Sequence, residues 1–128
     1  MNKYAQVALK AIEIVKIKNI SPEDAWTEAS RQIFPESESS RKKACPKNAF
    51  LGLCEEGIII GVKQGNYTKS KDNKRYAIEA VDILRREGDL SEKHLWERIE
   101  KADKNKRHNQ QMHVVRALFN QNCIIFKI

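Results

Sequence analysis

Apolar side chains recur with helical spacing along six stretches of the chain, which predicts six helices with buried faces. The stretches are residues 4–18, 22–34, 46–56, 72–87, 92–100 and 108–121. Residues 4–18 leave only a narrow polar stripe, so we expect that helix to be mostly buried. Ser21 followed by Pro22 is typical of a helix start, and Gly57 and Gly88 are typical of helix ends.

Two β-branched runs have strand preference instead. Residues 58–62 (IIIGV) follow Gly57, and residues 123–128 (CIIFKI) close the sequence in the same way after Asn122. A single strand leaves its backbone groups unpaired, so we expect residues 58–62 to pair with residues 124–128. The predicted fold class is therefore mainly α with a small two-stranded β-sheet.

The predicted elements occur twice in the order helix–helix–helix–strand. Residues 2–5 (NKYA) resemble residues 73–77 (NKRYA), and the interval from Ser to Trp at 21–26 recurs at 91–96. We therefore predict a tandem duplication inside a single compact domain. The domain would span residues 1–128, with repeat units 2–62 and 73–128 joined by residues 63–72. Chance similarity is the alternative, because several spacings differ between the units.

Composition is that of an ordinary globular protein, with 32% charged and 41% hydrophobic residues. No apolar run approaches the ~20 residues of a membrane span, and the N-terminal stretch lacks the pattern of a signal peptide. Three cysteines, an odd number, fit reduced thiols better than a disulfide framework. We therefore expect a cytoplasmic protein with no membrane partner.

The cysteines and histidines do not form a metal-ligand pattern. Cys45 and Cys54 lie nine positions apart and Cys123 is distant, whereas zinc sites show close pairs. We expect buried thiols, no metal and no cofactor. Cys45 before a helix is the best nucleophile, because the helix dipole would lower its thiol pKa, and it would need His94 or His113 as a base. We predict that the protein is not an enzyme and keep a Cys45 enzyme as an alternative.

Positive charge is concentrated in the second half of the chain. The net charge is +7, and residues 63–128 hold 15 Lys and Arg against nine Asp and Glu. Such an excess suits nucleic acid or an acidic protein surface. Tyr67 lies among Lys63, Lys69 and Lys71, an arrangement that suits a stacked base or a phosphate. A solvated linker is the alternative for this segment.

The second unit resembles the three-helix core of helix-turn-helix and winged-helix DNA-binding domains. The resemblance rests on residues 83–88 (ILRREG), on Leu90-Ser91 opening a helix, and on residues 115–118 (VRAL) before a capped turn. It implies that the start of the third helix reads DNA. The hairpin wing of the winged-helix family is missing after Ile128, and the first unit offers a poorer reading surface.

We predict nucleic-acid contacts from two basic segments, the joint between the units and the region around the start of the last helix. Lys and Arg would neutralise phosphates, and Asn and Gln would pair with base edges. The predicted contacts are Lys63, Lys69, Lys71, Lys74, Arg75, Lys104, Lys106, Arg107, Asn109, Gln110, His113 and Arg116.

Residues 45–57 (CPKNAFLGLCEEG) and 65–70 (GNYTKS) are similar to a family of small bacterial proteins of unknown function. This resemblance covers most of the chain and implies no activity. We predict a small non-enzymatic nucleic-acid-binding or regulatory protein, with DNA preferred over RNA as its partner. The alternative is a protein-interaction module or inhibitor, an accessory or phage-encoded factor whose basic surface binds an acidic partner.

Overall fold

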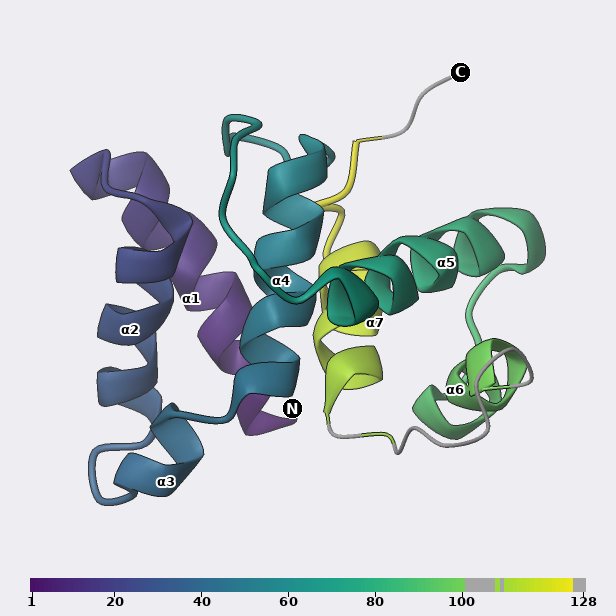
Figure 1. Cartoon of the computed structure of the whole chain (residues 1–128), viewed down its shortest axis with the longest axis horizontal. Coiled ribbons are helices and arrows are strands. Elements are labelled where there is room, and N and C mark those ends of the chain that lie inside the picture. Colours follow the sequence, from purple (N-terminus) through teal and green to yellow (C-terminus); the bar gives the residue numbers. More distant parts are fainter. Residues whose placement is uncertain (101–107, 109, 126–128) are drawn as a thin grey trace.

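Figure 1 shows the computed structural model of the chain, which describes residues 1–100, 108 and 110–125. The helices in chain order are α1 (Lys3–Lys18), α2 (Pro22–Ile33), α3 (Glu38–Arg41), α4 (Ala44–Glu56), α5 (Lys71–Glu87), α6 (Glu92–Glu100) and α7 (Gln111–Asn120). All six predicted helices are present. The short helix α3 lies between two of the predicted helices, in a stretch without a predicted element, and residues 101–107 and 109 lie outside the described residues.

The helix boundaries are set by local capping interactions. The side chain of Ser21 accepts a hydrogen bond from the backbone N–H of Asp24, which starts α2 as predicted. Ser70 does the same for α5, through the N–H of Asn73. Helix α4 ends at Gly57, whose φ of 79° lies in the left-handed region that glycine adopts without strain.

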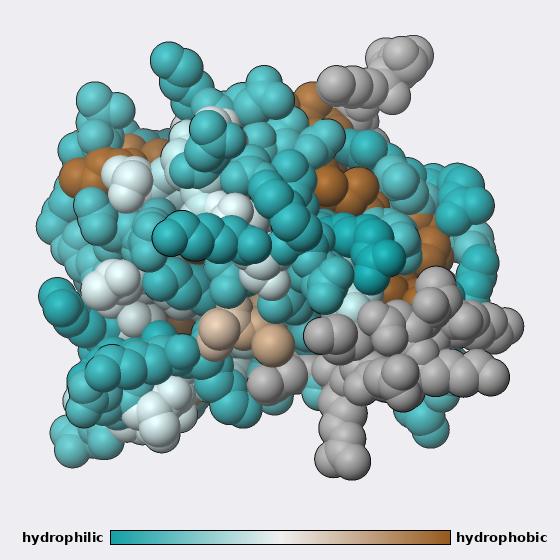
Figure 2. Space-filling model, viewed as in Figure 1, coloured by the Kyte–Doolittle hydropathy of each residue, from teal (hydrophilic) through white to brown (hydrophobic). Residues whose placement is uncertain are grey.

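Helices α4 and α7 lie at the centre of the molecule, with α1 and α2 on one side and α5 and α6 on the other (Figure 1). A cluster of buried apolar residues runs through every helix except α3. Two buried tryptophans anchor its two sides: Trp26 packs on Phe50, and Trp96 packs edge-on against Tyr76, each with ring centroids 5.3 Å apart. The outer surface in Figure 2 is mostly hydrophilic, with apolar residues exposed only in small areas.

The predicted two-stranded sheet is wrong: no strand occurs among the described residues. The two segments expected to pair do meet, but only at one isolated antiparallel bridge between Ile59 and Ile124. Two backbone hydrogen bonds flank the bridge, from Ile60 N to Cys123 O at 2.9 Å and from Ile125 N to Ile58 O at 2.8 Å. The fold of the described residues is therefore helical, with a single bridge in place of a sheet.

The chain turns too soon after Ile59 for a strand to extend. Gly61 has a φ of 84°, and the N–H of Val62 bonds back to the carbonyl of Ile59 at 3.2 Å. Ile59 is 1% exposed while its neighbour Ile60 is 45% exposed. The β-branched residues at 58 and 59 are therefore explained by their burial against the core and not by a strand. Strand preference largely depends on how a side chain packs, so a buried run can show it without forming a sheet.

The internal repeat stays a prediction. Helices α1 to α4 fall in unit 2–62, and α6 and α7 fall in unit 73–128. Helix α5 begins at Lys71, two residues before the second unit and inside the predicted joint. The strand that was expected to close each unit is absent from the described residues, so that part of the repeat pattern is corrected.

Candidate functional site

Helix α7, which was expected to read DNA, lies in the core. It contacts α1, α4, α5 and α6, and its buried residues include Gln111, Met112 and Leu118. Gln111 is only 2% exposed, and its side-chain amide donates to Asn73 at 3.1 Å. A helix enclosed on this many sides has only a narrow outer face left for a ligand.

The predicted contacts on and before α7 are held by neighbouring side chains. Arg116 donates two hydrogen bonds of 2.8 Å to Asp89 and one of 3.0 Å to Glu92. The Arg116 guanidinium holds the pKa of Asp89 below its ordinary value. Gln110 accepts from Asn2 at 2.9 Å, and the His113 ring stacks on that of His108 with centroids 5.3 Å apart. Lys104, Lys106, Arg107 and Asn109 lie outside the described residues.

The predicted contacts at the start of α5 form ion pairs that join α5 to α4. Lys74 lies 2.9 Å from Glu55 and 3.3 Å from Glu56, and Lys71 lies 3.7 Å from Glu55. Arg75 pairs with Asp72 at 3.6 Å on its own helix. Each of these cations is therefore paired with an acid of the same chain, and they do not form a common site on the surface.

Glu55 is the anchor of the segment between α4 and α5, residues 57–70. Its side chain is 7% exposed and accepts hydrogen bonds from Lys74 Nζ at 2.9 Å and from the backbone N–H groups of Tyr67 and Thr68 at 2.9 and 3.3 Å. Lys74 and the Tyr67 N–H lower the pKa of Glu55 from 4.5 to about 2. The segment is thus held against α4 by a buried carboxylate that remains ionised at neutral pH.

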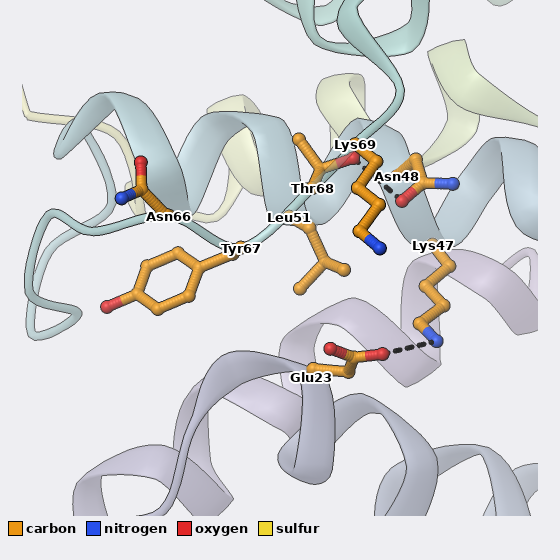
Figure 3. A pocket seen from close by; sticks show the side chains of 8 residues that line it. All are labelled: Glu23, Lys47, Asn48, Leu51, Asn66, Tyr67, Thr68 and Lys69. Carbon is orange, nitrogen blue, oxygen red and sulfur yellow. Dashed lines mark hydrogen bonds and ion pairs between the residues drawn. The ribbon is translucent and has the colours of Figure 1, made fainter.

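The held segment forms one wall of a pocket of about 520 Å³, shown in Figure 3. The start of α2 and the first half of α4 form the other walls. The lining residues are Glu23, Lys47, Asn48, Leu51, Asn66, Tyr67, Thr68 and Lys69. We call this the central pocket.

The polar groups of the central pocket are only partly engaged with one another. Lys47 pairs with Glu23 at 3.2 Å, and the Thr68 hydroxyl donates to Asn48 Oδ1 at 2.8 Å. That bond leaves the side-chain NH₂ of Asn48 as a donor without a partner among the described residues. Lys69 is exposed, and its ammonium likewise has no ion pair in the described part of the chain.

Tyr67 is fixed in place at the edge of the central pocket. Its hydroxyl donates to the carbonyl of Lys63 at 2.6 Å, and its ring lies directly on Gly65. A Cβ at position 65 would lie 2.7 Å from the Tyr67 ring, closer than side-chain atoms pack, so any larger residue there would displace the ring from this position. The ring is half-exposed and immobilised, which suits a stacking surface.

Of the predicted site residues that the structure describes, only Lys69 lines the central pocket, and Lys63 lines a second pocket that shares Tyr67. The sequence analysis missed the contribution of Lys47 and Asn48, because nothing local shows that α4 faces residues 66–69. It also missed Glu55. A signal was present, since Glu55 lies one turn after the buried Leu51 and an acid on a buried helix face needs partners.

The Cys45 alternative gains no catalytic partner from the geometry. Cys45 is half-buried in the first turn of α4. His94 bonds to Ser91 on its own helix, and no hydrogen bond joins either His94 or His113 to Cys45 in the described part of the chain. No cluster of three metal-ligating side chains occurs among these residues, and none of their helices is long and apolar enough to cross a membrane.

The chain was compared with curated proteins, with solved structures and with protein-family models. No curated protein matches the chain, and no solved structure matches it. A model of a family of unknown function, DUF6979, matches residues 1–125. This match confirms the expected membership of a family without assigned function and covers nearly the whole sequence. The chain therefore belongs to the DUF6979 family.

Proposed function

We propose that this protein is a small non-enzymatic nucleic-acid-binding protein whose binding site is the central pocket. The observation that supports the proposal is one pocket lined both by the ammonium of Lys69, which has no ion pair among the described residues, and by the fixed ring of Tyr67. In the view of Figure 3 the two side chains lie on either side of Leu51. A cation and an immobilised aromatic ring in one pocket match a phosphate joined to a base, because the ammonium attracts the phosphate and the ring stacks on the base.

The amides of the central pocket add hydrogen-bonding capacity to this pair. Asn48 offers its side-chain NH₂, and Asn66 is exposed at the rim. Lys47 is partly neutralised by Glu23, so Lys69 supplies the larger share of the attraction for a phosphate. DNA is the first ligand to test, in keeping with the sequence-based prediction. A cytoplasmic location belongs to the same proposal and is supported by three cysteines that are present as thiols.

The proposed site differs from the surface that the helix-turn-helix resemblance implied. Binding through α7 would require Arg116 to leave Asp89 and Glu92, which means breaking three charge-assisted hydrogen bonds. The central pocket needs no such rearrangement, because Lys69 has no partner to give up within the described residues.

Arg116→Gln is expected to lower the free energy of unfolding by about 1 kcal/mol, because Asp89 and Glu92 lose a partner at a partly exposed site. The same variant should leave affinity for a single-stranded oligonucleotide unchanged. Urea unfolding and fluorescence anisotropy measure the two effects. A lower affinity with unchanged stability would contradict the structural role of Arg116 and would indicate that α7 takes part in binding.

Lys69→Ala is expected to weaken binding of a fluorescein-labelled, twelve-nucleotide single-stranded DNA about fivefold at low salt. The slope of log K against log salt should also fall by about 0.7, since one phosphate contact is lost. Lys93→Ala is the matched control, because Lys93 is also a surface lysine without an ion pair among the described residues but lies on α6, away from the central pocket.

Three outcomes of this measurement would overturn the proposal. Wild-type protein could fail to bind DNA or RNA even at low salt. Lys93→Ala could weaken binding as much as Lys69→Ala, which would indicate unspecific attraction. The protein could bind polyglutamate but no nucleic acid, which would favour the alternative of an acidic protein partner.

A further inference from the structure

Two further pockets adjoin the central pocket. An upper pocket of about 480 Å³ lies between the α1–α2 turn and residues 61–67, and it shares Tyr67 with the central pocket. A lower pocket of about 310 Å³ lies between α2 and α3, and it shares Lys47 with the central pocket. Shared lining residues mean that the three pockets are neighbours along one surface.

The three pockets follow α2 in order. Residues 20–22 line the upper pocket, Glu23 lines the central pocket, and residues 26–31 line the lower pocket. Figure 1 shows α2, α3 and the connection from α4 to α5, which carry most of these lining residues. We call the upper, central and lower pockets together the groove. Helix α2 has 12 residues, so the groove is about 18 Å long at 1.5 Å per residue. That length matches about five nucleotides stacked at ~3.4 Å each.

Cations outnumber acids along the groove. Among the described lining residues the acids are Glu23 and Glu38, and each pairs with a groove lysine, at 3.2 Å to Lys47 and 2.7 Å to Lys42. Five further cations remain after this pairing: Lys16, Lys63, Lys69, Arg31 and Arg41. Arg41 donates to the backbone carbonyls of Phe34 and Pro35, and it shares with Lys42 the attraction of Glu38.

The other described pockets do not share this excess. The pocket at α6 and His108 sets Lys93 against Glu92 and Glu97. The pocket at the start of α1 sets Arg116 against Glu92. Among these five pockets of the described residues, the largest excess of cations over acids therefore lies along α2.

We propose that the groove along α2 binds a single nucleic-acid strand, with phosphates along its cations and one base stacked on Tyr67. This inference rests on the proposed function. It extends the binding site from the central pocket to the whole groove and specifies that the bound nucleic acid is single-stranded. A duplex is disfavoured because its major groove is read by a protruding helix or ribbon, whereas this site is a recess between elements. Trp26 also lines the lower pocket but is 2% exposed, so Tyr67 is the stacking ring of the path.

The test uses variants at the two ends of the groove. Arg31→Gln removes an exposed cation from the lower pocket. Lys16→Gln removes one from the upper pocket and keeps a polar side chain there. Each should weaken a twelve-nucleotide oligothymidylate about three- to tenfold and change a three-nucleotide oligothymidylate little, because only the longer strand reaches both ends. Lys69→Ala should weaken both, and Lys93→Gln should change neither.

The outcomes separate the groove from the central pocket. If Lys69→Ala lowers the affinity for the twelve-nucleotide strand while both end variants leave that affinity unchanged, the groove proposal is wrong and binding at the central pocket is retained. If no oligonucleotide binds, the proposed function itself fails. A duplex of the same length that binds as tightly as the single strand would overturn the strandedness, and polyglutamate that displaces the strand at equal charge concentration would overturn the choice of nucleic acid.

Discussion

Gly52→Ala is expected to lower the free energy of unfolding by about 2–3 kcal/mol. Gly52 is buried in the middle of α4, where an alanine Cβ would lie 2.6 Å from the Cα of Lys74 on α5. A contact this short with a backbone atom cannot be relieved by a side-chain rotation, so the two helices must move apart. Overpacking of this kind typically costs 1–3 kcal/mol, and the loss of contacts around the α4–α5 interface adds to it.

The sign of this effect makes it informative. Replacing glycine by alanine inside a helix normally raises stability by about 1 kcal/mol, because alanine has the higher helix propensity. Asp82→Ala at an exposed position in the middle of α5 is the control and should raise stability by a few tenths of a kcal/mol. Urea unfolding followed by circular dichroism measures both. Stability that rises in Gly52→Ala would show that α4 and α5 do not approach this closely.

Glu55→Gln is expected to lower the free energy of unfolding by about 2–3 kcal/mol at pH 7. The pKa of Glu55 falls from 4.5 to about 2 on folding because Lys74 and the backbone N–H of Tyr67 bind its carboxylate. A group whose pKa is lower in the folded state stabilises the protein above its unfolded pKa. This contribution is therefore complete above about pH 5 and is lost as the pH falls from 4.5 toward 2.

The comparison with wild type across pH isolates this carboxylate. The stability difference between wild type and Glu55→Gln should be largest at neutral pH and should shrink as the pH approaches 2. Glu56→Gln is the matched control, because Glu56 also lies near Lys74, at 3.3 Å, but is 46% exposed. Its effect should stay below about 0.5 kcal/mol. A difference for Glu55→Gln that is constant with pH would contradict the role of its charge.

Glu55 also links stability to the candidate site. Its carboxylate holds the N–H groups of Tyr67 and Thr68, and both residues line the central pocket. Without the Glu55 carboxylate, residues 67 and 68 lose the hydrogen bonds that hold this wall of the pocket against α4, while Lys69 and Lys47 keep their charges. We infer that the shape of the central pocket depends on the ion pair of Glu55 and Lys74, although neither residue lines the pocket.

Local sequence signals located most helix boundaries. Ser21 and Gly57 act as predicted, because a side-chain cap and a left-handed glycine satisfy backbone groups within a few residues. The same reasoning failed for residues 58–62. Strand preference there was real, but Gly61 turns the chain before a ladder can form, so the expected sheet is a single bridge.

The candidate site was predicted only in part for a related reason. Tyr67 and Lys69 were identified because an aromatic residue among lysines is visible in a short window. Lys47, Asn48 and Glu23 were not, since they come from other helices and meet Tyr67 only when α2 and α4 pack. For α7 the opposite happened. Gln110 and Arg116 look free along the sequence, but they bond to Asn2 and Asp89, which lie far away in the chain, and His113 stacks on His108.

The sequence by itself determined the helical elements, their caps and the sign of the net charge, because each depends on neighbours within one or two turns or on composition alone. Tertiary structure decided which helix is buried, which cations are neutralised and where the remaining ones gather. Those properties depend on distances between residues tens of positions apart, such as Glu55 with Lys74 and Arg116 with Asp89. Only the packing of α2 against α4 turns scattered lysines and arginines into a groove.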